Sequence, residues 1–269
     1  MQFIFWKDMK LSIITCTYNS EKYLSHCIDS IIKQNIEPNY FEHIFVDGES
    51  TDRTIKIIQK YQSDYPSYNI RVISSKPRWV YNAMNIGTRE ASWEYIYLLN
   101  SDDYIYQNWL VDILNYATKS KIDFCFWNTL YVDEFWNNTW ILKPNTLLIS
   151  LFYFWYHRLW LYLYHYCCPQ SVVYKRKIHE SIWYYNEQFR LLSDREYNIK
   201  TFSTNFKIKY LNTNVSCFRI HEWSVTSNKK NMELLYKEWK IIWNLYFWYP
   251  FGSIRVLIVK MIRFLFFRN

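Results

Sequence analysis

The sequence contains very little glycine: the 269-residue chain has three, at Gly48, Gly87 and Gly252. No glycine-rich loop follows the first apolar strand, where the chain reads TYNSEKYL, and this argues against a nucleotidyltransferase, which holds phosphate in such a loop. Gly48 and Gly87 stand near candidate functional residues, where backbone freedom or close approach of a ligand is most often needed. Half of the residues are apolar, so the chain can form a large core and is not disordered.

Cysteine pairs with metal-site or redox spacing are also missing. None of the six cysteines forms a CxxC motif, and several lie in apolar runs where a thiol packs as a small hydrophobic group. We therefore expect reduced, structural cysteines and a cytoplasmic protein. The first ten residues, MQFIFWKDMK, are too short for a signal peptide and are interrupted by Lys7 and Asp8.

Long uncharged apolar runs are lacking as well. The nearest candidate, 147–168, carries His157 and Arg158 at its centre, which argues against a membrane span. Its many aromatic residues leave a surface-lying membrane segment and an ordinary domain core as open interpretations. Runs of lysine and arginine are absent too, so nucleic acid is not expected as a partner despite the net charge of +8.

The carboxyl end is aromatic and basic. After a cluster of aromatic residues the chain reads IRVLIVKMIRFLFFRN, in which every charge is positive. This pattern is typical of a basic amphipathic helix attracted to an anionic membrane surface. We expect 226–269 to be a helical extension that associates with the inner face of the cytoplasmic membrane. A terminal helix docked on its own domain is the alternative, because an apolar and basic face serves both purposes.

Strand and helix patterns alternate over the first hundred residues. Strands are expected at Leu11–Cys16, His43–Asp47, Ile70–Ser74 and Tyr95–Leu99, and helices at Ser20–Gln34, Thr51–Tyr61 and Tyr81–Glu90. Ser20 is placed to cap the first helix, and Ser50 and Asp52 to cap the second. The alternation predicts an α/β fold with a mainly parallel central sheet flanked by helices.

The second half has a less regular pattern. It predicts a helix over 107–119, a strand over 122–128, a hairpin of 131–136 with 139–142, a strand over 171–174, a helix from Ser193, and strands over 208–211 and 215–219. We expect one catalytic domain over 1–225. Its parts are a nucleotide-sugar-binding half at 9–103 and an acceptor-facing half at 104–225.

Two adjacent carboxylates follow the fourth expected strand. Asp102 and Asp103 would lie at the carboxyl edge of the sheet, where open α/β sheets bind ligands, and could hold Mg²⁺ or Mn²⁺ against a diphosphate. Ser-Asp-Asp is also a good turn sequence, which leaves a structural role open. Asp47 ends the second strand, where a carboxylate can reach a base or ribose.

Four motifs occur in order: SIITCTYNSEKYL, FVDGESTDRT, VYNAMNIGTREASWEYIYLLNSDD and LLSDREYNIK. Together they resemble the family 2 glycosyltransferases, inverting enzymes with the GT-A fold, over about residues 9–225. The resemblance is strongest to members that build bacterial surface polysaccharides. It implies a nucleotide-sugar donor of the UDP type, a divalent metal, Mn²⁺ or Mg²⁺, and a saccharide acceptor linked to a lipid diphosphate.

The resemblance also implies roles for individual residues. Asp194 matches the catalytic base and Asp102 the metal-binding acid. The donor site would include Thr15, Tyr18, Glu21, Asp47, Asn82 and Asp103. Ser193 and Glu196 have the spacing of a capping box, which would place Asp194 on the first turn of a helix. An acid there also offsets the helix dipole, so a purely structural role stays open.

The sequence departs from the family pattern at four positions. Asn100 replaces the usual first acid of the metal motif, Asn82 replaces the Asp of Tyr-Asp-Ala-Met-Asn, and Trp79 replaces the usual glycine. Ser193 stands where the base motif often has Glu. The loss of charge leaves a non-catalytic nucleotide-sugar-binding or scaffold protein as the alternative to an active enzyme.

Further residues are candidates for the acceptor and the diphosphate. Gln170 and His221 match positions that the subgroup places near these groups, and neutral imidazole is a competent metal ligand. Arg78 and Lys175 could help to neutralise the leaving diphosphate. The histidines at 26, 43, 157 and 165 have no acidic or cysteine neighbours at metal spacing and are expected to be structural.

Overall fold

A computed structural model describes residues 10–76, 78–106, 109–135, 137–142, 167–222, 224 and 231–246. Its strands are β1 (Leu11–Thr17), β2 (Phe41–Asp47), β3 (Ile70–Ser74), β4 (Tyr95–Leu98), β5 (Tyr104–Ile105), β6 (Phe124–Val132), β7 (Asn138–Leu142), β8 (Val172–Lys175) and β9 (Ile208–Arg219). Its helices are α1 (Leu24–Ile32), α2 (Thr54–Asp64), α3 (Val80–Glu90), α4 (Leu110–Lys119), α7 (Lys177–Ile182), α8 (Ser193–Phe202) and α9 (Met232–Tyr246), with short 3-10 helices η2 (Pro38–Tyr40) and η3 (Pro169–Ser171).

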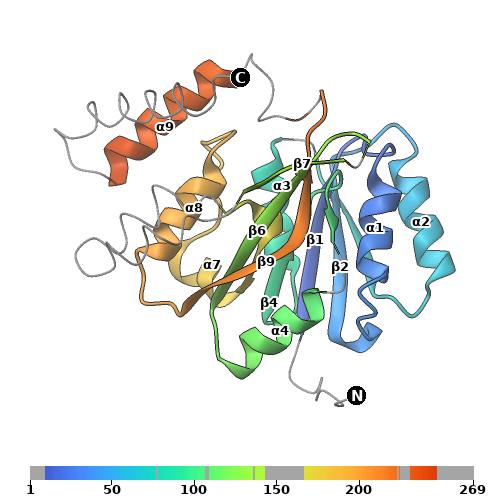
Figure 1. Ribbon diagram of the computed structural model, residues 1–269. Coiled ribbons are helices and arrows are strands. Elements are labelled where there is room, and N and C mark those ends of the chain that lie inside the picture. The colour runs from blue at the N-terminus through green and yellow to red at the C-terminus, as the bar shows by residue number, and fades with distance from the viewer. Residues whose placement is uncertain are drawn as a thin grey trace.

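The strands form one sheet in the order β3-β2-β1-β4-β8-β6-β9-β5, and β7 pairs with β6 (Figure 1). The strands from β3 to β4 are parallel, as the alternating pattern predicts. Antiparallel pairs enter with β8, which lies between β4 and β6, and with β5 and β7. The sheet is therefore parallel where the first half of the chain builds it and mixed beyond β4. This confirms the expected α/β fold.

Apolar side chains alternate between the two faces of the sheet, because successive residues of a strand point to opposite sides. On one face Leu11 and Ile13 pack with residues of α1 and α4. On the other, Ile14 packs with residues of α3, α7 and α8. Helix α2 joins α1 over Phe45. Both faces are thus covered, and ligands reach the sheet at its edges.

Helix α3 approaches the sheet closely at Gly87. A Cβ atom at this position would lie 2.4 Å from Ile14 Cγ2 and 3.1 Å from Val46 Cγ2. Both neighbours are buried branched side chains with little room to move. Glycine is required here for close packing, and this packing sets the position of the whole helix that borders the candidate site.

Helix α9 lies beside α8 (Figure 1). Ile242 and Trp243 of α9 form a buried cluster with Phe189, Leu192 and Ile199. For residues 232–246 the structure therefore has the docked terminal helix rather than a free extension. The basic segment 247–269 lies outside the described residues, as does most of the aromatic segment 147–168. No helix in the described ranges is long and apolar enough to cross a membrane.

Several boundaries differ from the sequence-based predictions. The helix expected from Ser20 begins at Leu24, and the Ser20 hydroxyl instead accepts the Tyr18 N–H at 3.2 Å. The two strands expected over 208–219 are one strand, β9, because it pairs with β6 along its whole length through two register shifts. Neither β5 nor α7 was predicted, since both are too short for a periodic signal.

Candidate functional site

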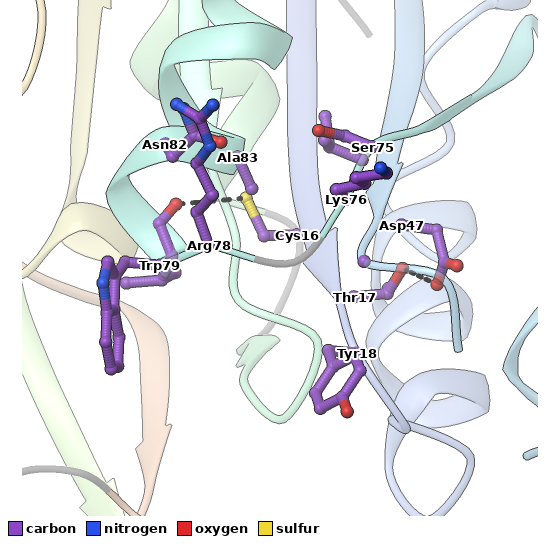
Figure 2. A pocket seen from close by; sticks show the side chains of 13 residues that line it. Cys16, Thr17, Tyr18, Asp47, Ser75, Lys76, Arg78, Trp79, Asn82 and Ala83 are labelled. Atoms are coloured by element: carbon purple, nitrogen blue, oxygen red, sulfur yellow. Dashed lines mark hydrogen bonds between the residues drawn. The ribbon is translucent and has the colours of Figure 1, made fainter. Parts of the chain in front are cut away.

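A cavity of about 380 Å³ opens where β1, β2 and β3 end, beside the first turn of α3. Its lining includes Thr17, Tyr18, Asp47, Lys76, Arg78 and Asn82. Figure 2 shows Thr17 and Asp47 on one side and Arg78, Trp79 and Asn82 on the other. A pocket at the carboxyl ends of parallel strands is the usual ligand site of an open α/β sheet. Two cationic side chains in its lining suit a phosphorylated ligand.

Asp47 is fixed in the wall of this cavity. Its carboxylate accepts the Thr17 hydroxyl at 2.8 Å, the Ser50 hydroxyl at 2.6 Å and the Ser50 N–H at 2.9 Å. Ser50 thus holds Asp47 and does not cap α2, whereas Asp52 accepts the Thr54 N–H at the start of that helix. A carboxylate can accept about four hydrogen bonds, so Asp47 can still receive one from a ligand.

The other predicted residues of the first strand end differ in their placement. Tyr18 is 60 % exposed and lines the cavity. Thr15 does not: its side chain is fully buried and lies 2.9 Å from His43 Nε2. The Glu21 carboxylate accepts hydrogen bonds from the N–H and the Nε of Arg53, and Glu21 is not among the described residues that line the cavity. Thr17, the last residue of β1, takes the place that was expected for Thr15, because only the end of the strand reaches the cavity.

Gly48 follows Asp47 in the wall of the cavity. It lines the cavity and donates its N–H to the Thr17 carbonyl at 2.8 Å, but neither glycine in the described ranges has a positive φ. The left-handed residue of this loop is Glu49, with φ of 60°. Gly48 therefore does not use the backbone freedom of glycine, and close approach of a ligand stays the prediction for this position.

Two asparagines of α3 bind an acid that the sequence analysis did not predict. Glu187 accepts hydrogen bonds from Asn82 and Asn85, both at 2.9 Å, and Asn85 is further fixed by the backbone of Tyr185. A carboxylate from a distant loop therefore lies beside position 82, where the family motif would carry its own acid. The sequence gives no local signal for Glu187, because 105 residues separate it from Asn82.

The acid pair after β4 divides into two roles. Asp102 is about one-third exposed, and its Oδ2 lies 2.9 Å from His221 Nε2. Asp103 is buried; it accepts the Arg219 N–H and the Asn100 amide, both at 2.9 Å. Burial and the nearby Asp102 carboxylate raise the pKa of Asp103 well above its usual range. Asp103 thus ties the end of β9 to the acid turn, and its expected contact with the donor stays a prediction.

Arg219 contacts the acid pair and lies next to His26. The Arg219 guanidinium donates to the Asp102 carbonyl at 2.8 Å and lies over the Tyr23 ring. Burial and the nearby Arg219 charge lower the pKa of His26 to about 4. His43 is also kept neutral, since burial lowers its pKa to about 3. Both have the structural roles expected for them, while His157 and His165 lie outside the described residues.

Asp194 lies on the first turn of α8, as predicted, and is only 4 % exposed. Its Oδ1 accepts the Tyr81 hydroxyl at 3.0 Å and the Arg195 N–H at 2.8 Å. The capping box is not formed: the Ser193 hydroxyl has no hydrogen-bond partner within the described chain, and Glu196 instead contacts Tyr246 and Lys200. Burial and the Asp194 charge raise the pKa of Tyr81, so this tyrosine remains a donor.

Gln170 lies in η3 and is completely buried. Its backbone carbonyl accepts the Tyr97 hydroxyl at 3.0 Å, while neither atom of its side-chain amide has a partner in the part of the chain that is described. A buried polar group without a partner is costly, so this amide is available to a ligand group that reaches it. An acceptor role for Gln170 stays a prediction.

Lys175 is wrongly placed for a diphosphate. Because β8 runs antiparallel to β4, Lys175 pairs with Tyr95 at the amino end of β4, away from Asp102. It forms an ion pair with Glu94 at 2.8 Å. Arg78 lines the cavity, as does Lys76, which sequence reasoning missed. His179, also missed, is buried against Tyr174, and burial lowers its pKa to about 3, so it is a neutral core residue.

These features define a nucleotide-sugar transferase type of α/β domain, and comparisons with known proteins agree. The model of glycosyl transferase family 2 matches residues 12–183. The chain is 36 % identical over 123 residues to the poly(ribitol-phosphate) beta-N-acetylglucosaminyltransferase TarS of Staphylococcus aureus. This alignment covers 43 % of this chain and 20 % of TarS. It is 28 % identical over 195 residues to a PGL/p-HBAD biosynthesis glycosyltransferase of Mycobacterium bovis, and this alignment covers 71 % of this chain and 69 % of the relative.

Solved structures share the fold. TarS 1–349 of S. aureus in complex with UDP-GlcNAc superimposes with a TM-score of 0.69 at 24 % identity, covering 87 % of this chain and 65 % of that one. The mannosyltransferase PcManGT of Pyrobaculum calidifontis, in complex with GDP-Man and Mn²⁺, gives a TM-score of 0.59 at 14 % identity and covers 87 % and 61 %. The chain belongs to glycosyl transferase family 2. Its match spans about a fifth of the length of TarS.

Proposed function

We propose that this protein is an inverting glycosyltransferase that moves a sugar from a UDP-sugar to a hydroxyl of a saccharide or polyol-phosphate acceptor. The observation that carries the proposal is the first turn of α3. Asn82 lines the cavity, and the residue before it, Tyr81, donates a hydrogen bond to Asp194. One rigid turn therefore connects a pocket of donor size with the acid that the family motif assigns as base.

The chemistry follows from this arrangement. The Asp194 carboxylate takes the proton of the acceptor hydroxyl while the oxygen attacks the anomeric carbon, and the bond from that carbon to the diphosphate breaks with both electrons leaving on the diphosphate. An aspartate has an ordinary pKa near 4, so its contribution as base depends on position more than on basicity. Tyr81 and the Arg195 N–H hold the carboxylate in place, and the oxygen that they share is Oδ1.

The residues after β4 fit a divalent cation. The Asp102 carboxylate and the His221 imidazole meet at a partly exposed position, and this mixed oxygen and nitrogen set suits Mn²⁺ better than Mg²⁺, which prefers oxygen alone. When bound, the ion supplies neutralisation of the charge on the departing diphosphate. In the described ranges no group of three or more His, Cys, Asp and Glu side chains converges to hold a metal. We expect binding of Mn²⁺ and of the donor to be cooperative, because a divalent cation at Asp102 would lie against the donor diphosphate.

Similarity to TarS and to a poly(ribitol-phosphate) beta-glucosyltransferase of Bacillus spizizenii supports UDP-GlcNAc and UDP-glucose as first donors to try, and poly(ribitol phosphate) as first acceptor. We further propose that the acceptor is lipid-linked and that the protein works at the inner face of the cytoplasmic membrane. The support is the basic apolar sequence after Tyr249. Truncation after Tyr249 leaves α9 intact and should move the protein from the membrane fraction to the supernatant; unchanged fractionation would count against the membrane proposal.

Two measurements test the proposed function. Thermal stabilisation by UDP, GDP, CMP and dTDP, each with and without Mn²⁺, should be largest for UDP with Mn²⁺. Transfer is then followed as UDP release from UDP-GlcNAc and UDP-glucose, with poly(ribitol phosphate) present or absent. Stabilisation without any release would support a non-catalytic binding protein instead, and no stabilisation by any nucleotide would reject the donor site.

A further inference from the structure

We propose that Glu238 of the carboxyl-terminal helix α9 is a positioning residue for Asp194, so that α9 is part of the catalytic apparatus. The inference rests on the proposed function, because it takes Asp194 as the base. It concerns a residue outside the matched family region, which ends at residue 183. None of the four sequence motifs includes it.

The geometry is a carboxylate bound by consecutive backbone donors. Glu238 is 3 % exposed. Its Oε1 accepts the Arg190 N–H at 2.7 Å, and its Oε2 accepts the N–H groups of Leu191 and Leu192, both at 3.0 Å. Successive backbone N–H groups form a concave anion site, and bonds to a charged acceptor are about twice as strong as neutral ones. A glutamate supplied by another helix thus fixes this turn.

The fixed turn leads directly into α8. Leu192 precedes the helix, and Asp194 is its second residue. The carboxylate of Glu238 therefore lies at the amino end of α8, where the helix dipole favours negative charge. A small shift of Leu192 would move Asp194 with it, since only Ser193 stands between them.

The same turn also contacts Tyr81 of α3 and Trp79, the residue before that helix. The Tyr81 hydroxyl lies 3.1 Å from the Leu191 carbonyl as well as 3.0 Å from Asp194 Oδ1, and the Arg190 guanidinium lies 4.0 Å from the centre of the Trp79 ring. Trp79 lines the donor cavity. The turn 190–192 is thus bound both by Trp79 of the cavity wall and by α9. The large side chain at position 79 contributes directly to this contact.

Helix α9 also contacts the residues that follow Asp194. Tyr246 donates a hydrogen bond to Glu196, and the Arg195 guanidinium lies 4.8 Å from the Trp239 ring centre. Residues before Asp194 (190–192) and after it (195 and 196) therefore both contact α9. These contacts together restrict its position, which matters because a misplacement of about 1 Å can cost on the order of 10²-fold in rate.

The test compares Glu238→Gln with Glu233→Gln in the full-length protein. Glu233 is an exposed residue of the same helix, so its substitution makes the same change of charge without touching the turn. The amide of a glutamine would point a donor at N–H donors and lose part of the anion site. With UDP-GlcNAc, Mn²⁺ and poly(ribitol phosphate), we expect Glu238→Gln to lower kcat by about 10-fold to 10²-fold while KM for the donor stays within about twofold. Glu238→Asp keeps the charge and should recover part of kcat.

A readout independent of turnover is amide hydrogen exchange. In Glu238→Gln the amides of residues 190–192 should exchange at least about tenfold faster, while those of β1 and β2 stay unchanged. Equal kcat in the Glu238→Gln and Glu233→Gln variants, or unchanged exchange of residues 190–192, would overturn the proposal. A fall in kcat that merely parallels loss of UDP binding would show a general folding defect and overturn it too.

Asp194→Asn separates this inference from the proposed function. If that variant keeps full turnover, Asp194 is not the base and the proposed function fails, whatever Glu238 does. If Asp194→Asn abolishes turnover and Glu238→Gln leaves it intact, the proposed function stands and the role of Glu238 is rejected. Exchange of residues 190–192 can be measured in either case.

Discussion

The two sides of the site are held together in different ways. On the proposed donor side, around Asp47, the ends of β1 and β2 are fixed by contacts between neighbouring strands and loops, as in the bonds from Thr17 and Ser50 to Asp47. The other side is the proposed base side, around Asp194. On the base side, Asp194 depends on Tyr81, which is 113 residues away, and on a turn bound by Glu238 from a separate helix. The donor side is thus built by adjacent βα units, while the base side is assembled by tertiary contacts. Changes on the base side should affect turnover, and changes on the donor side should affect binding.

The largest effect is expected for Asp194→Asn. Asparagine keeps the shape and can still accept the Tyr81 hydrogen bond, but it cannot take a proton from an acceptor hydroxyl. We expect kcat to fall by about 10³-fold, within the range typical of general bases, with the affinity for UDP unchanged. Steady-state UDP release and calorimetric titration with UDP measure the two quantities.

Glu180→Gln is the control for this prediction, because Glu180 is an exposed acid of α7 that is remote from the described cavity lining. It should behave as the unmodified protein does. A loss of UDP affinity in Asp194→Asn equal to the loss of kcat would break the proposed separation between the two sides.

The next effect is expected for Asp102→Ala. Removing the carboxylate takes away one of the two protein donors that meet at Asp102 and His221. Mn²⁺-dependent binding of UDP should weaken by about 10²-fold, while binding measured without metal should change little. Thermal shift with UDP, with and without Mn²⁺, checks this, and Asp112→Ala, at an exposed position of α4, is the matched control. Equal Mn²⁺ dependence in both variants would remove Asp102 from the metal site.

Sequence reasoning predicted the donor side better than the base side, for a physical reason. Strand and helix periodicity, and polar residues at strand ends, are local features, so the first four strands and the positions of Asp47 and Asp102 followed from them. The burial of Thr15 and Asp103 did not follow from these features, because one residue along the chain decides whether a side chain faces the cavity or the interior. Glu187 and Glu238 were not predictable, because their partners lie far away in the sequence and no pattern marks them.

Buried histidines on each side should make stability depend on pH. Burial lowers the pKa of His43, in β2, and of His179, in α7, to about 3, below the ordinary value near 6.5. The unfolded chain therefore binds more protons at mildly acidic pH, so the stabilisation is complete above about pH 6.5 and is lost as pH falls toward 3. Each histidine should add a slope of about 1.4 kcal/mol per pH unit to the free energy of unfolding.

The slope is measured as a difference between proteins. Asp103 acts in the opposite sense, because its pKa is raised on folding, and it is present in every variant. Urea unfolding of His43→Gln and of His179→Gln between pH 5 and 6 should each show a slope about 1.4 kcal/mol per pH unit smaller than that of the unmodified protein. If only one variant changes the slope, the two sides do not unfold as one cooperative unit.

Gly87→Ala tests the packing that aligns α3 with both sides. The added methyl group would meet Ile14 Cγ2 at 2.4 Å, and neither α3 nor β1 can move without disturbing the cavity wall. Overpacking should outweigh the helix propensity of alanine and lower the free energy of unfolding by about 1–3 kcal/mol. Ile14→Ala removes the clashing atom, so the double variant should be less destabilised than the sum of the two single variants. Additive effects would show that the backbone absorbs the methyl group elsewhere.

The smallest effect is expected at Asn82, which lines the cavity on the donor side and donates a hydrogen bond to Glu187. Restoring the acid of the family motif with Asn82→Asp would set two carboxylates against each other in place of the present hydrogen bond of 2.9 Å. Like charges at this distance repel, although the exposure of Glu187 screens them, so UDP affinity should fall by about 3-fold to 10-fold. Asn82→Asp combined with Glu187→Gln re-forms an amide and carboxylate pair with the roles exchanged, and should recover the loss. A coupling energy near zero in this double-mutant cycle would mean that Glu187 does not stand in for the missing acid, and that the donor side is independent of the base side at this point as well.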